Sequence, residues 1–164
     1  MQLSILLASV LFLVPHAAAD TVSSPTPPRL TYLYSANITL GLPVDLGDLP
    51  GKGSRTIFPI GGGEVRGPKI TGRMLAIGAD WGLNDTRGVY STDMRAQLET
   101  MDGAQIYIQS TGQGQPDGTV HIKASFQTGG ANYTWLNDVV AVGVMRSVND
   151  VVAVDMWQMT SPAS

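Results

Sequence analysis

Two residues of opposite charge, Asp93 and Arg95, stand two positions apart near the middle of the chain. Because side chains alternate between the two faces of a β-strand, both would point to the same side of a strand. A carboxylate held beside an arginine stays ionised and can take a proton from a substrate or orient one. The pair would be catalytic if it faced the inside of a barrel, and a weak exposed ion pair if it faced solvent.

A second carboxylate, Asp80, stands next to the aromatic ring of Trp81. With Asp93 and Arg95 it would set two carboxylates and a guanidinium against an aromatic wall. Such a group can enolise, dehydrate or cyclise a small aromatic or polyketide-like molecule, and it can equally hold a ligand without turnover. We therefore expect Asp80, Asp93 and Arg95 to be catalytic, Trp81 to stack a ligand, and the partner to be a small apolar or aromatic molecule.

A third cluster combines an aromatic ring and an amide, at Trp135 and Asn137. Two residues apart on a strand, they would face the same way and suit ligand stacking plus one oriented hydrogen bond. The alternative is a Trp that packs in the core and an Asn that caps a turn.

Most other kinds of chemical site find little support. The 164 residues include no cysteine, which removes disulfides, zinc-finger patterns and thiol nucleophiles. His121 lies in a strand-like stretch and is expected to face solvent, so neither a Ser-His-Asp triad nor a histidine metal site is indicated. The triplet at 61–63 lacks the Lys and Ser/Thr of a phosphate-binding loop and is interpreted as a bend. We expect no metal ion and no cofactor.

The charge balance is mildly acidic, because 10 Lys and Arg stand against 13 Asp and Glu, for a formal net charge of -3. A surface that is not cationic argues against nucleic acid and anionic membranes as partners. After the first residues, no apolar stretch reaches the roughly 18 residues of a membrane span.

The elements that must position these residues are strands. From Leu30 to Leu40 apolar and polar residues alternate, which is typical of a strand with one buried face. Asp102-Gly103 between two such runs predicts a hairpin turn. Residues 41–53, rich in Gly and Pro, are expected to form a loop. About nine strands without a convincing helix predict an all-β domain, a sandwich or a barrel.

The last two predicted strands, 135–148 and 151–159, are apolar on both faces. An up-and-down barrel wrapped by its own termini would explain this pattern. A homo-oligomer that buries the outer face would explain it equally well.

The first nineteen residues resemble a secretory signal peptide. Residues 5–14 are almost entirely apolar, and small residues end at Ala19, so cleavage is expected between Ala19 and Asp20. A Pro/Ser/Thr-rich lead-in would then occupy 20–29, the barrel 30–160 and a short tail 161–164. We expect a secreted protein, in the extracellular space or the lumen of the secretory pathway.

Three N-x-S/T sequences support secretion, at Asn37, Asn84 and Asn132. Each is a predicted glycosylation site, provided that it reaches the enzyme in an exposed segment.

Several short motifs occur together in this chain: Phe58-Pro59-Ile60-x-Gly62-Gly63, Gly78-Ala79-Asp80-Trp81, Asp93-x-Arg95, Asp102-Gly103-Ala104-x-Ile106-Tyr107 and Tyr133-x-Trp135-Leu136-Asn137. In this order and spacing they resemble the domain of unknown function 3237 (DUF3237) family, also called uncharacterised protein family 0311 (UPF0311). The resemblance covers roughly residues 30–159. It implies an antiparallel β-barrel similar to the calycin-like cups. By position it also adds Tyr107 to the recurrent polar and aromatic residues, and we include Tyr107 with Trp81, Trp135 and Asn137 as ligand-binding candidates.

Three functions follow from these patterns. The first is a secreted, cofactor-independent isomerase, cyclase or dehydratase that acts on an apolar or aromatic, polyketide-like metabolite; the resemblance implies that this metabolite belongs to secondary metabolism. The second is a lipocalin-like protein that binds a small ligand without turnover, and the third is a structural or oligomeric cell-surface protein. Paired carboxylates inside the cup favour the first, and purely apolar walls favour the second.

Overall fold

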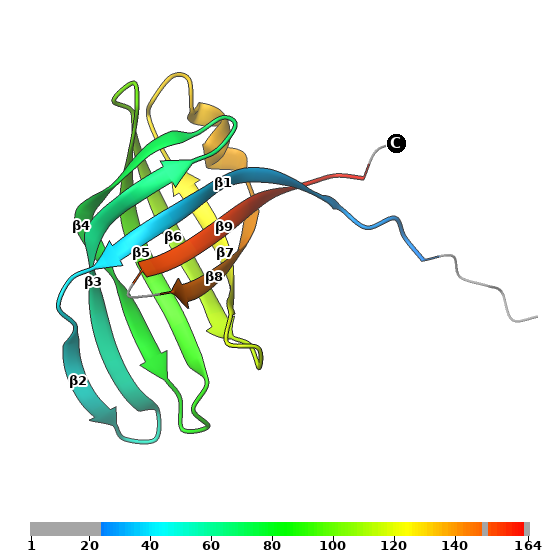
Figure 1. Cartoon of the computed structure of the whole chain (residues 1–164). Helices are drawn as coiled ribbons and strands as arrows, with labels where there is room; N and C mark the ends of the chain where they lie inside the picture. Colours follow the sequence, from blue (N-terminus) through cyan, green and yellow to red (C-terminus); the bar gives the residue numbers. More distant parts are fainter. Residues whose placement is uncertain (1–23, 149–150, 163–164) are drawn as a thin grey trace, which may run out of the picture.

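The computed structural model describes residues 24–148 and 151–162, so the predicted signal peptide lies outside the described residues (Figure 1). The described chain forms nine β-strands and one short 3-10 helix. In chain order they are β1 (Arg29–Leu40), β2 (Val44–Leu49), β3 (Gly53–Arg66), β4 (Thr71–Asn84), β5 (Tyr90–Thr100), β6 (Gln105–Gly114), β7 (Val120–Gln127), η1 (Thr134–Asp138), β8 (Ala141–Val148) and β9 (Val151–Thr160). The prediction of an all-β domain of about nine strands with little helix is confirmed.

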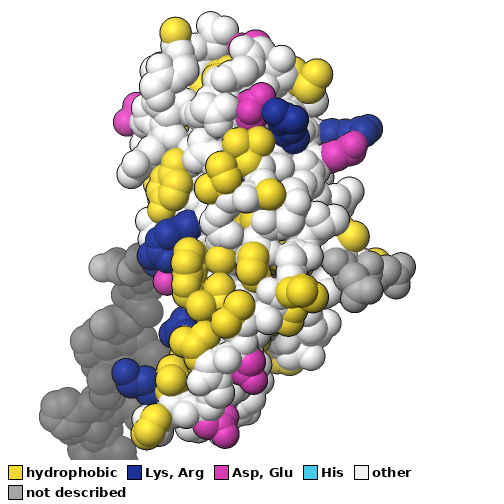
Figure 2. All heavy atoms as spheres, turned by 90° about the vertical axis from the view of Figure 1, so that its left-hand side faces the viewer, with side chains coloured by type: hydrophobic (Ala, Val, Ile, Leu, Met, Phe, Trp, Pro, Cys, Tyr) yellow, Lys and Arg dark blue, Asp and Glu magenta, His cyan; other side chains and the backbone are white. Residues whose placement is uncertain are grey.

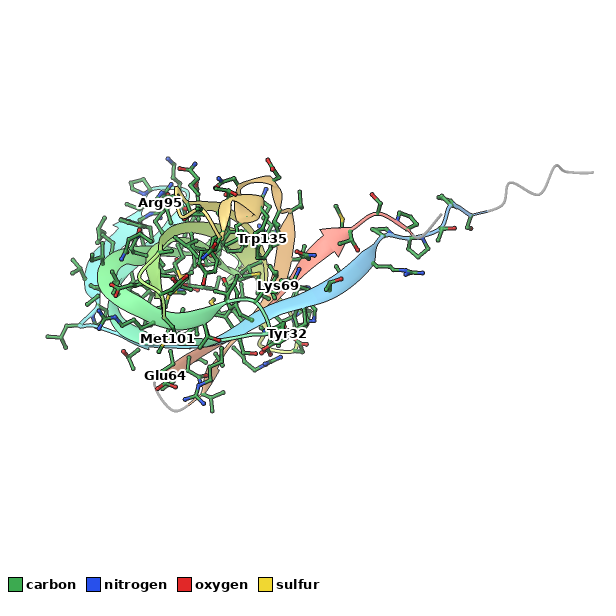
Figure 3. The ribbon with its side chains drawn as sticks, turned by 90° about the horizontal axis from the view of Figure 1, so that it is seen from above. Tyr32, Glu64, Lys69, Arg95, Met101 and Trp135 are labelled. Atoms are coloured by element: carbon green, nitrogen blue, oxygen red, sulfur yellow. The ribbon has the colours of Figure 1, made fainter. Side chains whose placement is uncertain are left out.

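Eight of the strands close into an antiparallel barrel. The order is β1-β9-β8-β7-β6-β5-β4-β3, and pairing of β1 with β3, from Ser35 opposite Arg66 to Leu40 opposite Ile60, joins the two ends. Seen from above, these strands enclose a ring (Figure 3). β2 pairs with the first half of β3 and adds a ninth strand outside the ring. The barrel prediction is thus confirmed over the sandwich.

The glycine triplet at 61–63 explains how β3 can pair with β2 along its first half and with β1 along its second half. The register of β3 against β4 shifts between Pro59 and Gly63, which marks a bulge inside the strand. Gly63 has a φ of 156°, and a β-carbon there would lie 2.3 Å from the carbonyl oxygen of Asn37. Only a glycine allows β3 to approach β1 so closely, so the triplet turns β3 from β2 onto β1.

Two expectations about local structure are wrong. Residues 41–53 are not only a loop, because β2 lies within them and pairs with β3. Residues 134–138 form η1 rather than the start of a strand. Leu136 accounts for this difference. Its side chain is completely buried at one end of the barrel, and the helical turn directs it into the core there.

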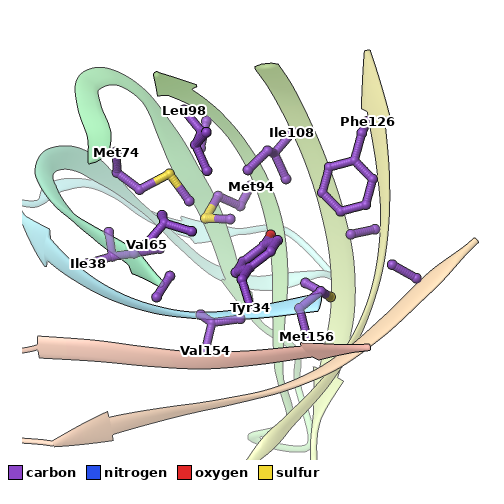
Figure 4. Close-up of a cluster of buried hydrophobic side chains, with 14 of the residues drawn as sticks. Tyr34, Ile38, Val65, Met74, Met94, Leu98, Ile108, Phe126, Val154 and Met156 are labelled. Atoms are coloured by element: carbon purple, nitrogen blue, oxygen red, sulfur yellow. The ribbon is translucent and has the colours of Figure 1, made fainter. Parts of the chain in front are cut away.

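Strict alternation on β5 separates the inside of the barrel from the outside. Thr92, Met94, Ala96, Leu98 and Thr100 are buried, whereas the residues between them are partly exposed. The buried apolar side chains of all eight wall strands meet in one core, with Tyr34 at its centre (Figure 4). Full burial of each large apolar side chain stabilises the fold by about 1.5–3 kcal/mol.

The outer wall also carries apolar side chains. On β2 and the neighbouring strands they form patches between charged residues, with Leu42 89% and Ile77 59% exposed (Figure 2). Over β8, β9 and the start of β1, Val140 and Leu30 are more than half exposed. No described residue covers this second area, and its burial in an oligomer stays a prediction. Within residues 24–148 and 151–162, no helix is long and apolar enough to cross a membrane.

Candidate functional site

A cavity of about 610 Å³ opens at the end of the barrel opposite η1. The turns between β4 and β5 and between β6 and β7 surround its mouth. Most of the wall is apolar, with side chains such as Ile38, Phe58, Val120 and Met145. This volume lies in the range of pockets that hold drug-sized molecules.

Among the described residues that line this cavity, Asp80 alone carries a carboxylate, and it is only 7% exposed. Residue 80 pairs with Phe58 on β3 and Met94 on β5, which both line the same cavity. Oδ2 of Asp80 accepts a hydrogen bond of 2.7 Å from the Tyr90 hydroxyl. Oδ1 accepts one of 2.9 Å from the backbone N–H of Asp93. Burial of a charged group without partners costs several kcal/mol, so these two bonds make the position tenable.

Tyr90 is the second polar group of the pair, and it also lines the cavity. Its pKa is raised, first by burial and then by the negative charge and hydrogen bond of Asp80. The hydroxyl therefore stays protonated and acts as a donor at neutral pH.

Gly82 makes the contact between Tyr90 and Asp80 possible. A β-carbon at residue 82 would lie 2.6 Å from the Tyr90 hydroxyl oxygen and 2.7 Å from a carbon of its ring. The ring of Tyr90 thus packs directly on the backbone of β4, two residues along from Asp80. Any larger residue at position 82 would push the ring away.

Further polar groups lie on the inner face and at the mouth. Thr92 is 4% exposed, and its hydroxyl has no hydrogen-bond partner among the residues that the structure describes. Arg146 borders the mouth, but its guanidinium lies on the outer face of β8, where it donates a bond of 2.7 Å to Asp155, which also accepts one of 2.5 Å from Ser35. These two bonds, that of Ser35 first, lower the pKa of Asp155.

A second hollow, of about 860 Å³, lies on the outer wall over β5 to β9. His121, Lys123 and Trp157 line it, but none of the described residues around it carries a carboxylate. It therefore lacks an acid–base pair, and the smaller cavity inside the barrel is the candidate site. No group of three or more His, Cys, Asp or Glu side chains that could hold a metal ion comes together in the described part of the chain.

Comparison with known proteins agrees with the barrel and its sequence motifs. A family model described as "protein of unknown function (DUF3237)" matches residues 28–121. The chain belongs to the DUF3237 family.

Relatives of this DUF3237 protein include one with a named activity. The hydroalkoxylation enzyme of Penicillium herquei is 28% identical over 147 residues, which span 90% of this chain and 94% of that enzyme. A UPF0311 protein of Rhodopseudomonas palustris is 30% identical over 145 residues, or 78% and 94% of the two chains.

Solved structures share the fold. A β-barrel-like protein of Acinetobacter baumannii has a TM-score of 0.78 and 32% identity, over 84% of this chain and 99% of that one. An enzyme from Penicillium herquei has a TM-score of 0.70 and 28% identity, over 84% and 98% of the two chains.

Two of the predicted catalytic residues do not share the cavity with Asp80. Asp93 and Arg95 form an ion pair of 3.0 Å on the outer wall, with side chains 42% and 40% exposed. The guanidinium of Arg95 lies 5.4 Å from the ring centroid of Trp81, also outside, and Figure 3 shows Arg95 pointing away from the ring of strands. The expectation that the pair faces inward is wrong, because residues 93 and 95 occupy the face of β5 opposite to Met94. Only the backbone of Asp93 reaches Asp80.

The predicted ligand-binding residues also lie away from this cavity. Trp135 packs under the ammonium group of Lys69, 5.2 Å from its ring centroid, and donates to the carbonyl of Asn132 (Figure 3). The side chain of Asn137 bonds to the backbone N–H and carbonyl of Thr128, so it caps a turn. Tyr107 borders a shallow hollow beside Asn137 on the outer surface. These contacts match the structural alternative for Trp135 and Asn137.

Asn37, Asn84 and Asn132 are all exposed, and their glycosylation stays a prediction. The sequence analysis missed Tyr90 and Gly82. For Tyr90 a signal existed, because residues 90, 92 and 94 share one face of a predicted strand with the apolar residues that follow. For Gly82 no sequence pattern indicated the role.

Proposed function

We propose that this protein is a cofactor-independent enzyme that closes a ring in a small apolar molecule by proton transfer, with Asp80 as the catalytic base. One observation carries the proposal. Asp80 is buried in an apolar cavity and accepts hydrogen bonds from Tyr90 and from a backbone N–H, while its surroundings leave room for a ligand. Carboxylates in such surroundings are frequent proton-transfer groups in enzymes.

The reaction that fits best is the addition of a hydroxyl group across a carbon–carbon double bond. The O–H bond and the π bond break, and one C–O and one C–H bond form. All atoms remain in the product, so neither an oxidant nor a reductant is needed. The named activity of the Penicillium herquei relative, hydroalkoxylation, supports this choice.

Asp80, Tyr90 and the apolar walls of the cavity each have a role in this reaction. Asp80 takes the proton of the substrate hydroxyl and returns it to carbon. Tyr90 stays protonated and holds the carboxylate in place. The apolar walls bind the carbon skeleton and keep water out, which strengthens the interactions of the carboxylate.

A second candidate function is a binding protein without turnover. The mostly apolar lining of the cavity favours it. The two functions differ in whether a bound molecule is converted.

The test uses two matched phenols in deuterium oxide: a chalcone with a hydroxyl ortho to its carbonyl, and ortho-cinnamylphenol, in which that carbonyl is a methylene. We expect at least one of them to yield the cyclic ether faster than in a protein-free control, with one deuterium bound to carbon. Asp80→Asn should lower the rate by roughly 10²–10⁴-fold with unchanged melting temperature. Binding of both probes without conversion would favour the carrier function and overturn the enzyme.

We also propose that the protein is secreted, in support of which stand the apolar stretch at 5–14 and the small residues before Asp20. N-terminal sequencing of protein from the medium of a eukaryotic host should begin at Asp20. Protein retained in the cytosol with Met1 would contradict this.

A further inference from the structure

We propose that the second hollow, on the outer wall of the barrel, binds a small aromatic carboxylate. This hollow has a volume of about 860 Å³, and among the described lining residues it shares only Gln115 with the cavity that holds Asp80. The inference goes beyond the proposed function and does not depend on it. It rests on the side chains that the strand register brings together there and on their charges.

One row of side chains crosses the hollow from polar to apolar. Lys123 on β7 pairs with Thr111 on β6 and with Val142 on β8. Val142 in turn pairs with Trp157 on β9. Neighbouring strands lie about 4.8 Å apart, so the backbones of Lys123 and Trp157 are about 10 Å apart. This spacing suits a ligand of one or two rings that carries an acidic group at one end.

The row beside it has the same order. His121 on β7 pairs with Gln113 on β6 and with Val144 on β8. Leu30, near the start of β1, adds another apolar side chain to the lining. The hollow therefore has a polar half over β6 and β7 and an apolar half over β8, β9 and the start of β1.

The apolar half offers an aromatic surface. Trp157 is partly exposed, and its ring packs against that of Tyr32 in an edge-to-face arrangement, with centroids 6.3 Å apart. This contact holds the indole in place while part of it still faces the hollow. Val142 lies on the neighbouring strand and extends the apolar surface toward Lys123. A flat ring of a ligand can pack there.

The polar half carries a positive charge that the lining does not balance. Lys123 takes part in none of the ion pairs between described residues. The two carboxylates that continue the rows, Asp93 and Asp155, are each paired with an arginine. Asp117 lies near His121, but the turn between β6 and β7 holds its carboxylate. A ligand carboxylate would thus pair with Lys123 and accept a hydrogen bond from the His121 ring.

A second copy of the chain fits this hollow less well. Contacts between identical chains mostly follow a two-fold axis, so that the same patch lies on both sides. A contact centred on the hollow would place the ammonium group of Lys123 near that of the other copy. None of the described lining residues supplies a carboxylate that could separate the two charges.

The test follows backbone amide shifts in NMR spectra of the ¹⁵N-labelled protein during titration with 2-naphthoate, neutral 2-naphthamide or acetate. Naphthoate should shift the amides of 121–123, 142–144 and Trp157. Naphthamide should bind there at least about threefold more weakly, and acetate should shift none of these amides. Lys123→Gln should weaken naphthoate to the level of naphthamide. The matched control, Lys52→Gln, removes an exposed charge between β2 and β3 and should change nothing.

Several results would overturn this inference. They are equal affinities for naphthoate and naphthamide, an unchanged affinity in Lys123→Gln, or no shifts at about 1 mM naphthoate. Shifts confined to the lining of the inner cavity, such as Val120 and Met145, would place the probe inside the barrel instead. Sedimentation equilibrium adds one more: a dimer that naphthoate does not enter, with the amides of 142–144 protected from exchange, would assign the hollow to a second copy.

Discussion

The hydroxyl of Tyr90, the first residue of β5, donates a 2.7 Å hydrogen bond to Oδ2 of Asp80 on the neighbouring strand β4. The bond joins two side chains that point into the barrel from adjacent strands. It places a carboxylate and a proton donor in contact inside the apolar cavity.

Gly82→Ala should lower activity by roughly 10–100-fold without unfolding the protein. The added methyl group would collide with the ring of Tyr90 and move its hydroxyl away from Asp80, and misplacement by about 1 Å can cost a hundredfold in rate. Gly129→Ala is the matched control, since a β-carbon there meets nothing within 4 Å. Equal activities of the two variants would show that Tyr90 does not need its present position.

Tyr34→Phe should protect the fold against alkali. Burial raises the pKa of Tyr34 above the ordinary value of 10.0. For a raised pKa, the stabilising contribution is complete below the unfolded value and is lost as pH rises from there toward the folded one. The wild type should lose about 1 kcal/mol from this group between pH 10 and 11, and the variant should not. Urea unfolding at pH 8 and pH 11 measures this, with exposed Tyr32→Phe as control; equal losses in wild type and Tyr34→Phe would contradict it.

Asp155→Asn should destabilise the protein slightly at neutral pH and not at low pH. Ser35 and Arg146 lower the pKa of Asp155, so its contribution is present above the unfolded pKa and lost as pH falls through the folded one. Because the pair with Arg146 is partly exposed, the effect at pH 7 should stay below about 1 kcal/mol. Thermal melts at pH 7 and pH 2.5 should show a difference between the proteins only at pH 7. A gap that persists at pH 2.5 would mean that the carboxylate is not its cause.

The fold could be read from the period-two pattern, because strands with one buried face dominate the chain. β2 was missed, since its Pro- and Gly-rich surroundings look like a loop and its side chains are mostly exposed. The sequence predicts a strand at Leu136, because a single buried residue in a short helix leaves no periodic signal.

The site was harder to predict than the fold. On β5 the apolar residues Met94, Ala96 and Leu98 turn inward, so the charged face carrying Asp93 and Arg95 must turn out. On β4 the rule is reversed: Asp80 is buried and Trp81 lies on the outer wall. Hydrophobicity alone predicts the opposite at these two positions. The partners that make a buried Asp80 acceptable come from β5, and the sequence does not reveal the register between the strands.

The central claim is that chemistry depends on the carboxylate inside the barrel and not on the charged pair outside. The most direct test compares kcat/KM, for whichever of the two phenols the wild type converts, in wild type, Asp80→Asn, Asp93→Asn and Arg95→Ala, after circular dichroism has shown that each is folded. We predict a fall of roughly 10²–10⁴-fold for Asp80→Asn and values within about threefold of wild type for the two outer variants, which lie on the exposed face. A full loss in Asp93→Asn or Arg95→Ala, or full activity in Asp80→Asn, would contradict the account.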